Sequence, residues 1–228
     1  MTAEQVYIQT LALGLDPAWR RRTDEERHHD GCRFGEADAA AGLAGVRSIT
    51  YSSIGLEPGV DLLFWRMAPS VDALETAAAA LLRAGLGTWL TVRHSLVGRI
   101  GASQYVRKPT DQEQSLFTGE RSRYLVVYPF TKTTGWYLLS KEARQGVMNE
   151  HMRVGHDYPT IRQALAYSFG LDSQDFVVAY ETDDLVAFGD LVRALRATES
   201  RRSTVSDTPI LLGIHRSMEE ILDLLGAR

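Results

Sequence analysis

The chain has 228 residues, a formal net charge of −4 and a hydrophobic content of 44%, enough apolar sequence to bury one large core or two of ordinary size. The net negative charge argues against a nucleic-acid-binding protein, because the phosphate backbone requires a concentrated basic face. The single cysteine, Cys32, excludes an intrachain disulfide and a cysteine-rich metal cluster.

The first half of the chain predicts a regular series of elements. It opens with a strand from Val6 to Leu13, followed by polar sequence of helical character. Two strands follow, from Tyr51 to Leu56 and from Val60 to Trp65, joined by a turn. A segment of helical period then has apolar residues at Val71, Leu74, Ala78, Leu81 and Leu82. The half ends with a strand near Trp89 to Ile100.

The second half predicts the same order. Its opening strand runs from Tyr124 to Phe130, and a helix follows from Ser140 to Arg153. The strand pair is Tyr167 to Leu171 and Phe176 to Tyr180. A second helix has apolar residues at Leu185, Phe188, Leu191, Val192 and Leu195, and a final strand is predicted near Pro209 to Ile214.

Each half therefore has the order β-α-β-β-α-β, which is the ferredoxin-like plan. We predict an α+β fold, a dimeric α+β barrel made of two ferredoxin-like halves at 1–106 and 124–228. The segment 107–123 is rich in charge and lacks apolar periodicity, so it is predicted as the linker. A chance similarity between short strands is the alternative explanation.

One histidine lies in a context that suits a metal ligand. His151 falls one turn after Val147 in the helix that Ser140 is predicted to cap. An imidazole there can ligate iron if an acceptor holds its other ring nitrogen. A lone helical histidine can equally be a surface residue or a satisfied core residue, so its position alone does not decide.

Four segments together resemble a known family. They are Tyr128-Pro129-Phe130-x-Lys132, Trp136-Tyr137-Leu138-Leu139, Glu150-His151 and Ser168-Phe169-Gly170-Leu171-Asp172. This pattern resembles the chlorite dismutase superfamily, and within it most of all the coproheme decarboxylases, which are peroxide-dependent haem synthases. The resemblance is close in the C-terminal half and extends to layout alone in the N-terminal half. It implies a haem or coproheme site in 124–228 and none in 1–106.

The resemblance implies roles for residues on the proximal side of the haem. His151 matches the ligand of the iron, and Glu199 matches the carboxylate that accepts from its free nitrogen. Lys132 matches the lysine that steadies this glutamate, and Trp136 matches an aromatic residue beside the haem. Without the resemblance, these would be ordinary charged or core residues.

On the distal side, chlorite dismutases carry an arginine that holds an anionic oxidant over the iron. Aligning this chain on Ser168-Phe169-Gly170 brings Gln163 to that position, while a shift of one residue would bring Arg162. An uncharged amide cannot perform the same electrostatic task. Tyr128 matches the tyrosine that coproheme decarboxylases oxidise to a radical; its alternative is a half-buried packing residue.

The implied substrate, iron-coproporphyrin III, carries four propionates and needs cationic and hydrogen-bonding contacts. Candidates are Lys108, Arg121, Arg123, Arg196, Gln163 and Ser203. The actinobacterial branch of the family uses a distal histidine in the linker, where this chain has Asp111-Gln112-Glu113. The source of peroxide deprotonation is therefore open.

The function that we predict is a haem-dependent oxidoreductase of haem and porphyrin biosynthesis, which decarboxylates iron-coproporphyrin III to haem b with hydrogen peroxide through a tyrosyl radical. The iron porphyrin is both substrate and cofactor. Alternatives are a chlorite-decomposing enzyme, a non-catalytic haem-binding protein and a non-haem ferredoxin-like module. By the resemblance we expect a homopentamer. No leader sequence is visible in Met1-Thr2-Ala3-Glu4-Gln5, and no segment approaches the roughly 18 apolar residues of a membrane helix, so we expect a cytoplasmic protein.

Overall fold

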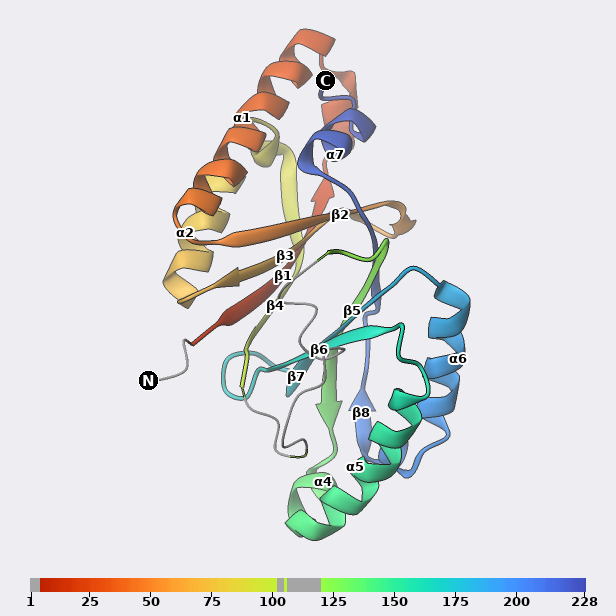
Figure 1. The fold of residues 1–228 in the computed structure, drawn as a ribbon. Coiled ribbons are helices and arrows are strands. Elements are labelled where there is room, and N and C mark those ends of the chain that lie inside the picture. The colour runs from red at the N-terminus through yellow and green to blue at the C-terminus, as the bar shows by residue number, and fades with distance from the viewer. Residues whose placement is uncertain (1–4, 102–104, 106–119) are drawn as a thin grey trace. The chain divides into compact units, whose positions relative to one another are not determined.

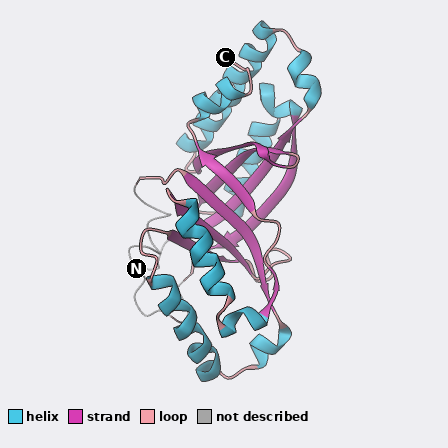
Figure 2. Cartoon of the chain, turned by 90° about the vertical axis from the view of Figure 1, so that its right-hand side faces the viewer, coloured by secondary structure: helices cyan, strands magenta, loops and turns pink. Residues whose placement is uncertain are grey.

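A computed structural model describes residues 5–101, 105 and 120–228. The chain forms two compact units, the first from Met1–Ile100 with Leu212–Arg228 and the second from Gly101–Leu211. In each unit the helices gather on one side of the strands (Figure 2). Of the helices in the described ranges, none is both long enough and apolar enough to cross a membrane.

The first unit is an antiparallel sheet with long helices packed on it (Figure 1). Its strands, in the spatial order β4-β1-β3-β2-β9, are β4 (Leu90–Arg99), β1 (Tyr7–Leu15), β3 (Val60–Ala68), β2 (Arg47–Glu57) and β9 (Leu211–His215). Its helices are α1 (Asp24–Leu43), α2 (Val71–Leu82) and α7 (Met218–Leu224), with short 3₁₀ helices at Pro17–Arg21 and Gly85–Trp89.

Local sequence explains where these helices begin. The Thr23 hydroxyl accepts from the backbone N–H of Glu26, whose carboxylate accepts from the Thr23 N–H, a capping box that starts α1. Ser217 and Glu220 form the same arrangement at α7. The apolar sides of the helices then pack over a core that includes Trp19, Phe34, Phe64, Ile221, Leu222 and Leu225, so the end of the chain completes the core of the first unit.

The second unit repeats the plan. Its sheet has the order β6-β7-β5-β8, formed by β6 (Arg162–Tyr167), β7 (Phe176–Thr182), β5 (Tyr124–Lys132) and β8 (Thr204–Ser206). Its helices are α4 (Thr134–Leu138), α5 (Lys141–His156) and α6 (Leu185–Arg196), with a 3₁₀ helix at Glu199–Ser203. Residues of α6 pack on one face of this sheet around Val178, Tyr180 and Leu191.

The predicted α+β class with two ferredoxin-like halves is confirmed. If the four strands of each half are numbered along the chain, the spatial order is 4-1-3-2 in both units, with β4 beside β1 and β8 beside β5. Of the predicted linker, residues 107–119 lie outside the described residues. Helix α5 begins after Ser140, whose hydroxyl accepts from Ala143 N–H, as its sequence predicts.

The strand predicted near Pro209 to Ile214 is present as β9, which stands next to β5 in the strand order. Its Ile214 and His215 also pair with β2. The structure accordingly assigns residues 212–228 to the first unit, a different division from the predicted half 124–228. The strand expected from Tyr167 to Leu171 ends at Tyr167, because Gly170 adopts a φ of 72° in the following turn.

Candidate haem site

The candidate site is built on the face of the second sheet that packs on α6. Side chains alternate between the two faces along a strand, so Tyr128 of β5 shares a face with Val178 and Tyr180 of β7. Gln163 of β6 is paired with Tyr180 across the strands and shares this face too. The two residues predicted to act on the distal side, Tyr128 and Gln163, therefore lie on one side of one sheet.

Arg162, the residue that a one-position shift would bring to the distal side, points to the opposite face. Its register partner is Glu181, and its guanidinium lies 3.3 Å from the Glu181 carboxylate. It also donates to the Ser122 hydroxyl at 2.7 Å and to the Glu120 carbonyl at 2.6 Å. These contacts hold the Arg162 side chain on the face of the sheet opposite Tyr128.

Tyr128 is a half-buried phenol with a buried phenol beside it. Its ring centroid lies 6.2 Å from that of Tyr180, with an interplanar angle of 31°, so the two phenols are direct neighbours. Burial, followed by Tyr180 and the charge of Asp207, raises the pKa of Tyr128 well above its usual value, while Arg196 opposes this. Tyr128 is therefore a neutral phenol at physiological pH.

His151 lies in α5 as a half-buried side chain. Burial, and then the charge of Lys132, lowers its pKa to about 4, with Glu150 acting in the opposite direction. The imidazole is thus neutral at physiological pH, and its lone pair is available to a metal without loss of a proton. Its Nδ1 is buried without a hydrogen-bond partner among the described residues.

Trp136 packs against Lys132, whose charge in turn acts on His151. The Lys132 ammonium is 4.5 Å from the centre of the Trp136 ring and 5.2 Å from that of Phe130. It donates to the Ser200 hydroxyl at 3.1 Å and to the Ser200 carbonyl at 3.3 Å. Burial, and then Arg201, lowers the pKa of Lys132 to about 8. Lys132 is thus the residue that connects Trp136 and His151.

The expected contact between Glu199 and His151 is absent from the described residues. The Glu199 carboxylate is 55% exposed and lies 3.4 Å from Arg202, while the Glu199 N–H donates to the Glu150 carboxylate at 3.0 Å. In the 3₁₀ helix, residues three apart lie on one side, so Glu199 and Arg202 meet at the surface. The next residue, Ser200, then points inward to Lys132, and this correction gives Lys132 a neutral partner.

The residues predicted to contact the propionates lie in different places, and Arg196 is near Tyr128. Arg196, at the end of α6, is 52% exposed, lies 3.9 Å from Asp207 and is close enough to Tyr128 to affect its pKa. Arg121 lies 3.5 Å from Glu181, on the other face of the sheet. Arg123 is exposed and lies over the Tyr124 ring, and Ser203 is half-buried in the 3₁₀ helix. Lys108 and Asp111-Gln112-Glu113 lie outside the described residues.

Sequence reasoning missed Tyr180, Ser200 and Asp207. Tyr180 could have been found, because strand alternation from Val178 puts it on the face of Tyr128 once β5 and β7 are paired. The carboxylate of Asp207, 2.5 Å from Arg201, follows a strand of only three residues, for which no periodic signal exists. Ser200 requires the geometry of the 3₁₀ helix.

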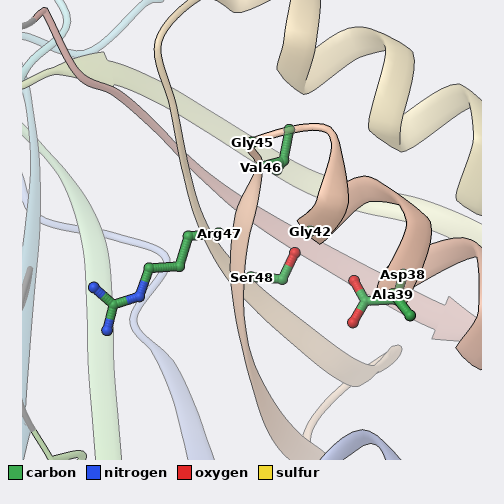
Figure 3. A pocket seen from close by; sticks show the side chains of 7 residues that line it. All are labelled: Asp38, Ala39, Gly42, Gly45, Val46, Arg47 and Ser48. Carbon is green, nitrogen blue, oxygen red and sulfur yellow. The ribbon is translucent and has the colours of Figure 1, made fainter.

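The first unit holds an open surface pocket of about 470 Å³ that contains none of the predicted site residues. Asp38 and Ser48 face it from α1 and β2, whereas the Arg47 side chain points away (Figure 3). Behind Asp38, at 4.0 Å, lies the fully buried guanidinium of Arg66.

The residues of the second unit fit an iron porphyrin. His151 is a neutral imidazole with a buried Nδ1 that has no hydrogen-bond partner among the described residues. A neutral imidazole is a common ligand of haem iron. Aromatic rings at Trp136 and Tyr128 suit the faces and edges of a flat macrocycle, and Arg196 suits a carboxylate substituent.

Comparison with known proteins agrees with this reading. The family model for chlorite dismutase matches residues 28–216. A coproheme decarboxylase from Mycolicibacterium smegmatis is 29% identical over 177 residues, which are 75% of this chain and 74% of the relative. A chlorite dismutase from Ideonella dechloratans is 27% identical over 148 residues, which are 61% of this chain and 52% of the relative.

A solved structure has the same fold over nearly the whole length. Chlorite dismutase from Candidatus Nitrospira defluvii, in complex with imidazole, matches with a TM-score of 0.89 and 27% identity. The match covers 97% of this chain and 95% of the other. One scaffold thus occurs in relatives named for two different activities.

Proposed function

Because the chain belongs to the chlorite dismutase family, we propose that it is a coproheme decarboxylase, which converts iron-coproporphyrin III to haem b with hydrogen peroxide. The relative from Mycolicibacterium smegmatis carries the name of that activity. The observation that carries the choice within the family is the residue opposite Tyr180. It is the uncharged Gln163, whereas Arg162 is committed to Glu181 on the other face.

The proximal residues would hold the substrate. His151 would bind its iron through a ring nitrogen, which the low pKa of this imidazole leaves unprotonated down to about pH 4. Trp136 would pack beside the macrocycle, and Lys132 would hold the local structure through Ser200. Arg196 would pair with a propionate, because its guanidinium is exposed and lies near Tyr128.

The bound iron, together with peroxide, supplies the oxidising equivalents for the reaction. Tyr128 would give up one electron and its hydroxyl proton to the peroxide-derived oxidant, and the resulting phenoxyl would take a hydrogen atom from a propionate. Loss of a second electron to the same oxidant would then release carbon dioxide and leave a vinyl group. A phenol with a raised pKa keeps its proton until the electron leaves. Gln163 would offer a neutral hydrogen bond to peroxide without the charge that retains an anion such as chlorite.

The test is a titration of the purified protein with iron-coproporphyrin, followed by peroxide and mass analysis of the porphyrin products. We expect two of the four propionates each to lose carbon dioxide and become a vinyl group. Tyr128→Phe should bind the porphyrin normally and yield no decarboxylated product. His151→Ala should weaken binding, whereas His156→Ala, at an exposed position of the same helix, should not. Normal turnover by Tyr128→Phe would contradict the proposed role of Tyr128.

Chlorite decomposition is the second candidate, because relatives of that name share the fold. It requires a positive group on the distal side, so the unmodified protein loaded with haem b should evolve little oxygen from chlorite. Gln163→Arg should raise this oxygen evolution. Rapid oxygen evolution by the unmodified protein would favour chlorite as the substrate, and stable haem binding with neither reaction would indicate a haem-binding protein.

A further inference from the structure

We infer that Tyr180 is a positioning residue for Tyr128, a role that rests on the proposed decarboxylation and assigns a function to the buried phenol next to the reacting one. Tyr128 and Tyr180 are diagonal neighbours on adjacent antiparallel strands, since Tyr128 is paired with Val178 and Tyr180 with Val126. At this diagonal spacing aromatic side chains reach each other. Their ring centroids are 6.2 Å apart, with an interplanar angle of 31°.

The two phenols differ in how firmly they are held. Tyr180 is only 5% exposed, and the Phe188 ring of α6 packs on it at 5.3 Å and 55°. Tyr128 is half-buried and open to the site. Tyr180 therefore has a fixed position from which its hydroxyl can hold that of Tyr128, while Tyr128 keeps access to a substrate.

Tyr180 also lies next to the distal residue. It is the direct register partner of Gln163 in the pairing of β6 with β7, so its side chain stands between Gln163 and the strand that carries Tyr128. Tyr180 therefore lies beside both proposed distal residues, Gln163 and Tyr128, in the same sheet. A site held by strands and packed rings keeps its geometry better than one held by loops.

A hydroxyl can serve both states of Tyr128, because it is a donor and an acceptor at once. Before oxidation, the Tyr128 O–H can donate to the Tyr180 oxygen. When the peroxide-derived oxidant takes the electron and the hydroxyl proton of Tyr128, the Tyr180 O–H can turn and donate to the phenoxyl oxygen. No bond of Tyr180 breaks, and the hydrogen atom taken later from the propionate restores the Tyr128 O–H. Phenylalanine at position 180 would fill the same space and could do neither.

The test compares Tyr180→Phe with the unmodified protein. The substitution removes one oxygen and retains the contact with Phe188, so we expect the protein to fold normally. In apoprotein labelled with ¹³C at tyrosine Cζ, the Tyr128 resonance, identified by its loss in Tyr128→Phe, should shift and titrate at lower pH, because the neighbouring Tyr180 phenol raises the pKa of Tyr128. With iron-coproporphyrin and peroxide, the first decarboxylation in a single turnover should slow by about tenfold or more, at unchanged porphyrin affinity.

Tyr167→Phe is the matched control, since it removes a phenol hydroxyl from the same face of the same sheet at the position paired with Phe176. It should leave the Tyr128 resonance and the single-turnover rate unchanged. An active unmodified protein with an unaltered Tyr180→Phe variant would overturn the role of Tyr180 and leave the proposed function intact. No decarboxylation by the unmodified protein would overturn the proposed function, and this role with it.

Discussion

Lys132 is an ammonium group removed from water with no carboxylate beside it among the described residues. It is 8% exposed, and its contacts are the Ser200 oxygens and the faces of two aromatic rings. Hydrogen bonds and ring contacts compensate only part of the cost of desolvating a charge, which is why the pKa of Lys132 falls to about 8. The charged Lys132 side chain therefore lowers the free energy of unfolding.

Lys132→Met should therefore stabilise the apoprotein at pH 7. Because the folded-state pKa lies below the unfolded value of 10.5, the penalty is fully present below about pH 8 and fades as the pH rises to 10.5. A shift from 10.5 to about 8 corresponds to roughly 3 kcal/mol, so we expect a gain of about 1–3 kcal/mol in the free energy of unfolding. Urea denaturation at pH 7 and pH 10 measures it.

Lys141→Met is the control, because Lys141 is exposed at the start of α5 and its removal should change stability by less than about 0.5 kcal/mol. A loss of stability in Lys132→Met at pH 7 would show that the ammonium contacts outweigh its desolvation.

The sequence could identify which residues belong to the site more readily than the face to which each side chain points. Arg162 and Gln163 are adjacent, and their faces are decided only by a strand that begins at Arg162, whereas the predicted strand began at Tyr167. Glu199 and Ser200 are adjacent too, and the short 3₁₀ helix decides which of them turns inward. In both pairs, the side chain that faces the site depends on the exact residue at which the strand or the 3₁₀ helix begins. The neighbouring side chains do not identify that residue.

At the scale of elements, α5 is held with less burial than the other long helices. None of its residues is fully buried, although it carries His151, so its first turn depends on the Ser140 cap. A helix with few buried apolar contacts opens more readily than the core. The element that would bind iron is therefore among the less stable parts of the second unit.

Ser140→Ala should loosen α5 and weaken porphyrin binding. Loss of an N-cap costs about 1 kcal/mol, and we expect faster amide hydrogen exchange in α5 together with a several-fold weaker affinity for iron-coproporphyrin. Ser70→Ala, which removes the equivalent cap of α2 in the first unit, should cost similar stability and leave porphyrin affinity unchanged. Equal affinities in the two variants would contradict the link between the α5 cap and the site.

Helix starts were predictable because capping is local: Ser140 and the residues that follow it contain all the information that begins α5. The pairing of β9 with β2 was not predictable. The strand β9 stands next to β5 in the strand order, where the repeated order of elements predicts it. Its contacts with β2, however, connect residues more than 150 positions apart, as in the 2.6 Å bond from the Ser53 hydroxyl to the Leu212 carbonyl, and no short-range pattern encodes contacts at that separation.

For the whole molecule, the last residues complete the first unit. Ile221, Leu222 and Leu225 are buried in the same core as Trp19, and the Trp19 indole N–H donates to the Leu225 carbonyl at 3.2 Å. The twofold ferredoxin-like plan was predictable from periodicity, because each half repeats the same succession of elements. The assignment of residues 212–228 was not, since α7 has no counterpart in the second unit.

Removal of residues 217–228 should destabilise the first unit selectively. Three large buried side chains, each contributing about 1.5–3 kcal/mol, are lost together, so we expect a decrease of roughly 5 kcal/mol or more in its free energy of unfolding. Urea unfolding followed by hydrogen exchange of β1 and β3 measures this. Leu224→Ala, at a position 54% exposed, should have little effect, and unchanged exchange in the shortened chain would contradict the importance of α7.

The division of the first unit between the two ends of the chain also affects its biosynthesis. A ribosome adds roughly 5–20 residues per second, so Trp19 and Phe34 emerge well before Ile221 and Leu225 have been translated, although all four belong to one core. The second unit, Gly101–Leu211, is continuous in the chain. The region synthesised first would thus mature last, once residues 221–225 have left the ribosome.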